Sequence, residues 1–168
     1  MAYLLDTNIL ARLANAADPL YAVTTQAVMK LHRLGEILYI TPQVLIEFRN
    51  TATRPLSMNG LGLSIVQAEA EVAGFEAKFP LLPETPDIYP AWKALVGALG
   101  IIGKQVHDAR LVAICHVHKV THLLTFNTSH FLRMASFGPG VTVVDPRERV
   151  GTPERDNQRV KALAPANA

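Results

Sequence analysis

Three acidic residues lie beside apolar segments, where a carboxylate can have a chemical role rather than being an ordinary surface charge. Asp6 directly follows the apolar run 3–5, which is typical of a buried strand. Glu47 interrupts an apolar stretch of an expected helix, and Asp108 lies in the first turn of another helix, beside its apolar face. Closely spaced carboxylates take up protons unless a cation neutralises them. The three positions therefore indicate a cation-binding site.

Asn127 is a fourth candidate, because it follows the expected strand 121–125 much as Asp6 follows the first strand. The carboxyl ends of parallel strands meet at one edge of a sheet, where α/β proteins bind ligands. Taken singly, each residue has an ordinary explanation: Asp6 as a helix cap, Asp108 as a favourable charge on a helix dipole, Glu47 as a surface charge and Asn127 as a turn residue. Their combination favours one shared site.

The chemistry of such a site follows from its ligand atoms. Carboxylate and amide oxygens suit Mg²⁺ or Mn²⁺ better than zinc. A divalent ion held this way lowers the pKa of a bound water and stabilises the charge that develops on a phosphodiester. The sequence therefore predicts metal-assisted phosphoryl chemistry.

The elements that must position these residues alternate between short apolar runs and longer helical patterns. Asp18-Pro19 and Thr41-Pro42 each predict a helix start, with a capping side chain before proline, and Ser64 to Gln67 matches a capping box. The expected strands are 2–5, 36–40, 121–125 and 141–144, and the expected helices are 7–14, 19–34, 42–53, 65–79, 86–99, 104–118 and 128–135. This alternation predicts an α/β fold with a short central parallel sheet flanked by helices.

Composition narrows the class of protein. The 168 residues suit one domain, 49% of them are hydrophobic, and the net charge of +2 permits a nucleic-acid partner without arguing for one. The longest apolar stretch, 94–103, is far shorter than the roughly 20 residues of a membrane span. The single cysteine, Cys115, excludes an internal disulfide and is typical of a cytoplasmic protein. We expect a folded domain over 1–145 and a flexible polar tail over 146–168.

Four segments, in this order, resemble the PIN-domain family: Leu4-Leu5-Asp6-Thr7-Asn8, Glu47, the stretch 107–113 and the stretch 124–131. The resemblance covers about residues 1–145, and the size and layout look most like a VapC-type toxin. It implies a PIN-like α/β/α sandwich and an endoribonuclease that depends on Mg²⁺, with Mn²⁺ as a substitute. It also implies a homodimer, inhibition by a cognate antitoxin protein, and products with 5′-phosphate and 3′-hydroxyl ends.

The resemblance also assigns roles to residues of this chain. Asp6, Glu47 and Asp108 would be catalytic, metal-binding carboxylates, and Asn127 would be the fourth catalytic position. The supporting residues would be Thr7 and Asn8, which orient Asp6 or a metal-bound water, and Thr125, which adds a hydroxyl to the same pocket. The family often has aspartate where Asn127 stands and an acid where His130 stands. The number of metal ions, one or two, therefore stays open.

The RNA contacts are less sharply marked, because no dense basic patch is visible. The candidates are Arg54, Lys104, Arg110 and His130, each of which could equally be a solvated surface residue. Arg54 is favoured because it follows Glu47 by seven residues and would share its helical face if the helix continued that far. The segment 61–79 could form an antitoxin groove or a dimer surface, or simply pack on the core.

Two other interpretations remain. A PIN scaffold with weak or no catalysis could act only as a binding module, and the neutral Asn127 leaves room for this. A haloacid-dehalogenase-like phosphatase also begins with an aspartate at a strand end, but it needs a second acid two residues later, where this chain has Asn8. Neither the RNA that is cut nor the antitoxin can be named from the sequence.

Overall fold

A computed structural model describes residues 1–150 and shows a four-stranded, all-parallel sheet. The strands are β1 (Ala2–Leu5), β2 (Ile37–Tyr39), β3 (His122–Leu124) and β4 (Thr142–Val144), in the spatial order β2-β1-β3-β4. The helices are α1 (Thr7–Leu13), α2 (Tyr21–Arg33), α3 (Pro42–Thr53), α4 (Ile65–Lys78), α5 (Ile88–Leu99), α6 (Gln105–His118), α7 (Thr128–Ala135) and the short α8 (Pro146–Arg149). The expected α/β sandwich is confirmed.

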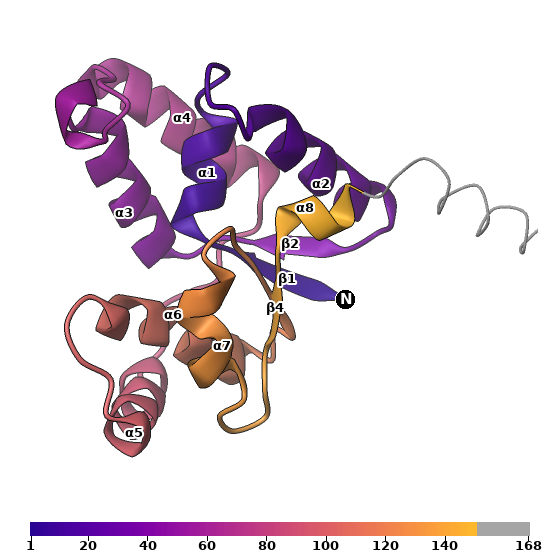
Figure 1. Ribbon diagram of the computed structural model, residues 1–168, viewed down its shortest axis with the longest axis vertical. Helices are drawn as coiled ribbons and strands as arrows, with labels where there is room; N and C mark the ends of the chain where they lie inside the picture. The colour runs from indigo at the N-terminus through magenta and orange to yellow at the C-terminus, as the bar shows by residue number, and fades with distance from the viewer. Residues whose placement is uncertain (151–168) are drawn as a thin grey trace, which may run out of the picture.

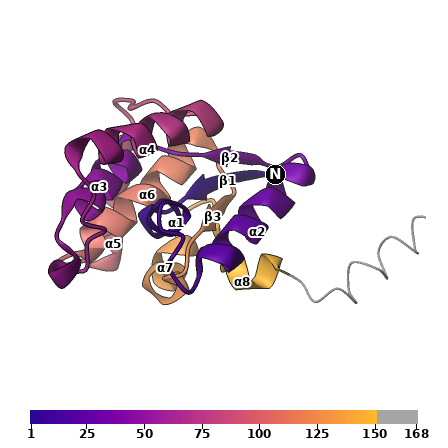
Figure 2. The same ribbon diagram turned by 90° about the horizontal axis from the view of Figure 1, so that it is seen from above.

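The helices lie on both sides of the sheet. Figure 1 shows α1 to α4 on one side of the strands and α5 to α7 on the other. Figure 2, seen from above, shows α1 end-on beside β1 and β3. The first segment of the chain therefore lies at the centre of the molecule.

The central strands are held by apolar burial. Tyr3, Leu4 and Leu5 of β1 are fully buried, as are Leu123 and Leu124 of β3. A short strand that is apolar at consecutive positions is expected where helices cover both faces of a parallel sheet. In the register, Leu4 lies opposite Leu123 and Leu5 opposite Leu124, so the two strands end side by side. The residues that follow β1 and β3 therefore lie at the same edge of the sheet.

Two of the predicted helix starts are confirmed. The Thr41 hydroxyl accepts a hydrogen bond from the Val44 backbone at 3.2 Å, with Pro42 in the first turn of α3. Ser64 and Gln67 form the complete capping box that opens α4. These caps satisfy backbone N–H groups that would otherwise lack a partner at a helix end.

The predicted start of α2 at Asp18-Pro19 is wrong by two residues. The Asp18 side chain accepts a hydrogen bond from the Leu20 backbone at 2.7 Å, forming a turn before the helix, and α2 begins at Tyr21. Aspartate favours such turns for the same reason that it favours helix caps. The expected strand 36–40 is also longer than the observed β2, because Ile40 does not pair with β1 and instead forms an isolated bridge with Leu81.

The prediction that Arg54 continues the helical face of Glu47 is wrong as well. Helix α3 ends at Thr53, and the backbone of Arg54 is extended. The chain then turns so tightly that a side chain at Gly60 would collide with the Arg54 carbonyl. Arg54 donates a hydrogen bond to Thr51 within this turn.

The segment after β4 begins with ordered structure. Asp145 caps α8 by accepting from the Arg147 backbone, and its carboxylate also pairs with the Arg147 guanidinium at 2.6 Å. Helix α8 packs on α2. The remaining part of the expected tail, residues 151–168, lies outside the described residues. Among helices within residues 1–150, none is long and apolar enough to cross a membrane.

Candidate active site

The Asp6 carboxylate is buried at the end of β1 and is held by two side chains. Its Oδ2 accepts hydrogen bonds from Asn8 Nδ2 at 2.5 Å and from Thr125 Oγ1 at 2.6 Å. The Asp6 backbone N–H donates to the Leu124 carbonyl, so the sheet hydrogen bonding continues to this residue. Asn8 and Thr125, the supporting residues suggested by the sequence, therefore both contact the Asp6 carboxylate.

Thr125 and Asn127 follow β3 at the same edge. The fully buried Thr125 hydroxyl also accepts from Asn8 Nδ2 and from the Asn127 backbone, at 2.9 and 3.0 Å. Asn8 Oδ1 in turn accepts from the Phe126 backbone. The Asn127 side chain is exposed and caps no helix. Thr125 therefore joins the two strand ends, whereas Asn127 faces solvent beside them.

Glu47 enters the site from α3 and is fixed by two contacts. Thr7 Oγ1 donates to Glu47 Oε2 at 2.8 Å, and Gln43 Nε2 donates to Glu47 Oε1 at 2.8 Å. Gln43 lies one helical turn before Glu47, so both side chains point to the same side of α3. The Thr7 side chain thus contacts Glu47, and its backbone N–H bonds to Asp6; the sequence had suggested that Thr7 orients Asp6 or a metal-bound water.

Asp108 enters from the first turn of α6. The Trp92 indole donates to the Val106 carbonyl at 2.8 Å, which ties this turn to α5. The Asp108 carboxylate is half-buried and faces the exposed His130 imidazole at 3.4 Å. His130 thus has a partner within the site in addition to its expected role as an RNA contact.

Electrostatic coupling shows that the three carboxylates share one environment. The pKa of Asp6 is raised to about 6, mainly by burial; the negative charges of Asp108 and Glu47 also raise it, and hydrogen bonds from the Thr125 side chain and the Thr7 backbone oppose the rise. Burial also raises the pKa of Asp108, and Glu47 adds to this while His130 opposes it. Such repulsion is what a bound cation relieves.

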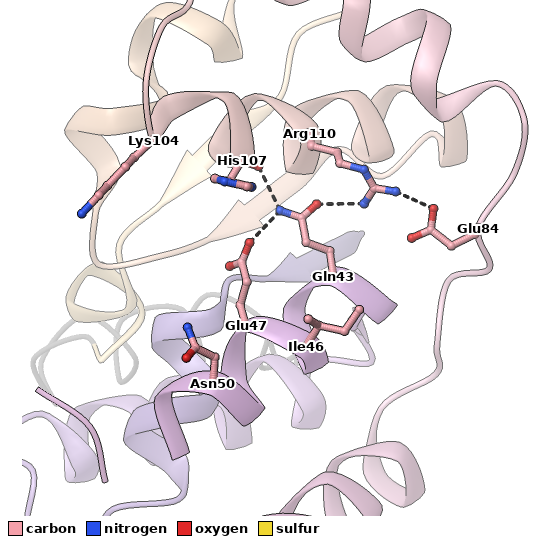
Figure 3. Close-up of a pocket in the computed structure, with 8 residues that line it drawn as sticks. All are labelled: Gln43, Ile46, Glu47, Asn50, Glu84, Lys104, His107 and Arg110. Carbon is pink, nitrogen blue, oxygen red and sulfur yellow. Dashed lines mark hydrogen bonds and ion pairs between the residues drawn. The ribbon is translucent and has the colours of Figure 1, made fainter. Parts of the chain in front are cut away.

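A pocket of about 640 Å³ opens beside Glu47, between α3 and the start of α6 (Figure 3). Its lining residues are Gln43, Ile46, Glu47, Asn50, Glu84, Lys104, His107 and Arg110. Figure 3 shows the α3 residues on one wall and Lys104, His107 and Arg110 on the other. The pocket therefore adjoins one of the carboxylates.

Sequence reasoning missed two residues of this region, Gln43 and Glu84. Gln43 donates to Glu47 and to the His107 carbonyl at 3.0 Å, and accepts from Arg110 at 2.9 Å. Glu84 accepts from Arg110 at 2.6 Å. The spacing of Gln43 four residues before Glu47 was the available signal, but it does not reveal contacts with α6.

Of the expected RNA contacts, Lys104 lines the pocket with its side chain exposed. Arg110 also lines it, although Glu84 and Gln43 already hold its guanidinium. Arg54 is not among the lining residues.

The donor set fits a hard divalent cation in its chemistry. Oxygen atoms from three carboxylates are available, with no thiolate near them, because Cys115 is buried in the core. Within residues 1–150, however, no three His, Cys, Asp or Glu side chains are arranged to share one metal ion.

A family model for the PIN domain matches residues 3–136. The chain belongs to the PIN-domain family. The resemblance inferred from the sequence motifs is therefore confirmed, and the matched residues include all four candidate site positions. Comparison with curated protein sequences gave no match.

Solved structures share the fold at low sequence identity. The chain is similar to VapBC2 from Rickettsia felis, bound to a DNA fragment from its promoter, with TM-score 0.66 and 17% identity over 86% of this chain and 98% of that one. VapBC-1 from nontypeable Haemophilus influenzae gives 0.63 and 17% over 87% and 98%. VapC20 from Mycobacterium tuberculosis, a toxin that cleaves the sarcin–ricin loop, gives 0.56 and 18% over 76% and 92%.

Proposed function

We propose that this PIN-domain protein is a metal-dependent endoribonuclease and the toxin of a VapBC-type toxin–antitoxin module. The observation that carries the proposal is that Thr7, the neighbour of Asp6, donates to Glu47 from another element, so that two carboxylates meet at one edge of the sheet. Asp108 lies near enough for its charge to raise the pKa of Asp6. The likeness to VapBC structures and to an RNA-cleaving VapC supports the substrate class. Action on RNA implies a cytoplasmic location.

In the proposed mechanism, Asp6, Glu47 and Asp108 would hold Mg²⁺ or Mn²⁺, which would neutralise the scissile phosphate and activate a water. Asn8 and Thr125 keep Asp6 at a fixed position, so its carboxylate does not need to reorganise during the reaction. Thr7 and Gln43 do the same for Glu47. The reaction is attack of water on a phosphodiester, leaving 5′-phosphate and 3′-hydroxyl ends.

The test is cleavage of total RNA by purified protein with Mg²⁺ or Mn²⁺, with EDTA, and with the Asp108→Asn variant in parallel. We expect cutting that requires metal and is lost in the variant, while circular dichroism shows that the variant is folded. Equal cutting by wild type and variant would indicate a contaminating nuclease and remove support for Asp108. Phosphate release from small phosphoesters would instead support the phosphatase alternative.

A second candidate function is a binding module with weak or no catalysis. The observation in its favour is the neutral, exposed Asn127 at the fourth site position. An Asn127→Asp variant separates the two functions. A wild-type protein that binds RNA without cutting it, together with cutting by the variant, would favour the binding module.

We further propose two protein partners, a second copy of the chain and an antitoxin. Exposed apolar side chains on α4 support a protein contact there, since Ile65 and Val66 are 68% and 78% exposed. This lies in the segment 61–79 for which a partner surface was expected. Light scattering of the purified protein, and of the protein co-expressed with the product of its neighbouring gene, measures both associations.

A further inference from the structure

The pocket beside Glu47 is shaped and sized for a small ligand, since its volume of about 640 Å³ falls among those of small-molecule sites. Its position matters more than its size. Because Glu47 forms part of the wall, any group in the pocket would lie next to the carboxylate site. An RNA chain cut at that site would pass this opening.

One wall carries an available positive charge. The guanidinium of Arg110 is engaged by Glu84 and Gln43. The Lys104 ammonium, by contrast, makes no ion pair with any residue of 1–150, and Figure 3 shows this lining residue at the edge of the group, beyond His107 and away from Arg110. A free lysine among the lining residues suits a phosphate group.

The opposite wall offers contacts of another kind. Ile46 is 69% exposed although it is a large apolar residue. Asn50 follows it by one helical turn, and its side-chain amide forms no hydrogen bond with residues 1–150. An amide carries donors and an acceptor, as the edge of a nucleobase does, and an apolar side chain can pack on the face of a base. This wall therefore suits a base.

We propose that the pocket binds the nucleotide next to the scissile phosphate, with Lys104 contacting its phosphate and Ile46 and Asn50 contacting its base. Asn50 then determines which base is preferred at that position. The inference rests on the proposed ribonuclease function and adds a specificity-determining residue to it. Arg110 and Gln43 have a separate task, which is to hold Glu47 and the wall of the pocket.

The first experiment sequences the ends produced from total RNA by wild type, Asn50→Ala, Lys104→Ala and the control Lys78→Ala. Lys78 ends α4 and does not line the pocket. We expect Asn50→Ala to lose roughly 5- to 150-fold of discrimination at one position beside the cut. Lys104→Ala should slow cutting at all sequences alike and weaken the salt dependence, and Lys78→Ala should change neither.

The second experiment measures RNA binding without catalysis. Anisotropy of fluorescein-labelled, mixed-sequence 10-nucleotide single-stranded RNA is followed in EDTA, with each substitution placed in the Asp108→Asn background. Lys104→Ala should weaken binding several-fold relative to Lys78→Ala. If the wild type cuts nothing but this difference is found, the pocket binds RNA although the nuclease proposal fails, and no base preference beside a cut exists to assign to Asn50.

The proposal is overturned if Asn50→Ala leaves the base distribution unchanged while Lys104→Ala leaves RNA affinity unchanged. It is also wrong if Ile46→Ser alters the oligomeric state in light scattering and leaves RNA affinity intact, because the wall would then be a protein interface.

Discussion

Asp6 and Glu47 face the same site but are held in different ways. Asp6 is buried at the end of β1, and its carboxylate is bonded to Asn8 and Thr125 inside the sheet edge. Glu47 is half-buried on α3, and one of its two bonds comes from Gln43, which itself depends on Arg110. We call Asp6 and its partners the strand side of the site, and Glu47 and its partners the helix side. The strand side is fixed by the main chain and the core, and the helix side by a surface network of side chains.

This difference separates two kinds of sensitivity. A change on the strand side alters both folding free energy and catalysis, because the polar groups there are buried and fully paired. A change on the helix side alters mainly catalysis, because water can replace the lost partners. Three substitutions, which give four predictions, test the distinction.

The largest effect is expected for the activity of Asp6→Asn. Loss of the buried charge removes the proposed metal ligand and its electrostatic contribution, so the RNA cleavage rate should fall roughly 100- to 1000-fold. Asp87→Asn is the matched control, because Asp87 is exposed and its side chain caps no helix. A single-turnover assay measures both. A rate within a few-fold of wild type would show that Asp6 is not part of the reacting site.

The same variant should become more stable when no metal is bound. The pKa of Asp6 is about 6 in the folded chain and 3.8 as its ordinary value, so its proton is lost more readily on unfolding. The contribution of Asp6 to the free energy of unfolding is thus favourable below about pH 4, where the carboxyl is protonated, and is lost as the pH rises to about 6. Removing the charge should add about 2 to 3 kcal/mol at pH 7. Urea unfolding in EDTA at pH 5 and pH 7 measures this, and a larger gain at pH 5 would contradict it.

Thr125→Val should destabilise the strand side by about 1 to 3 kcal/mol. The substitution keeps the side-chain shape but leaves Asp6, Asn8 and the Asn127 backbone without their shared hydroxyl. It should also raise the pKa of Asp6 further, since that hydrogen bond lowers it. Thr125→Ser is the control that keeps the hydroxyl. Equal denaturation midpoints for the Val and Ser variants would refute this role of Thr125.

The smallest effect on folding is expected for Gln43→Leu. Glu47 loses one of its two holding bonds, so cleavage should slow about 10-fold, while the unfolding free energy changes by less than about 1 kcal/mol. Gln26→Leu, an exposed site on α2, is the control. A large loss of stability with unchanged activity per folded molecule would contradict this prediction, because the network would then stabilise the fold and have no role in catalysis.

The same contrast explains how far the sequence could predict this protein. The place of Asp6 follows from a short apolar run and the rule that parallel strands end at one edge, both of which are local patterns. Asp108 and Glu47 were grouped with it by residue type and apolar surroundings, and the family resemblance supported that grouping. The bonds of Gln43 to the His107 carbonyl and Arg110 join segments more than 60 residues apart. A local sequence pattern does not predict such a contact. The orientation of Arg54 could not be predicted either, because it depended on the residue at which α3 ends.

The order of the strands has a consequence for how the protein is made. Strand β1, which ends at Asp6, is synthesised before β3, and the hydroxyl that completes its site lies 119 residues later in the chain. At roughly 5 to 20 residues per second, about 6 to 24 s separate the synthesis of the two segments. During this interval the nascent chain contains Asp6 but lacks β3 and Thr125, which hold its carboxylate in the folded protein. The proposed ribonuclease site is therefore complete only after β3 and Thr125 have been synthesised.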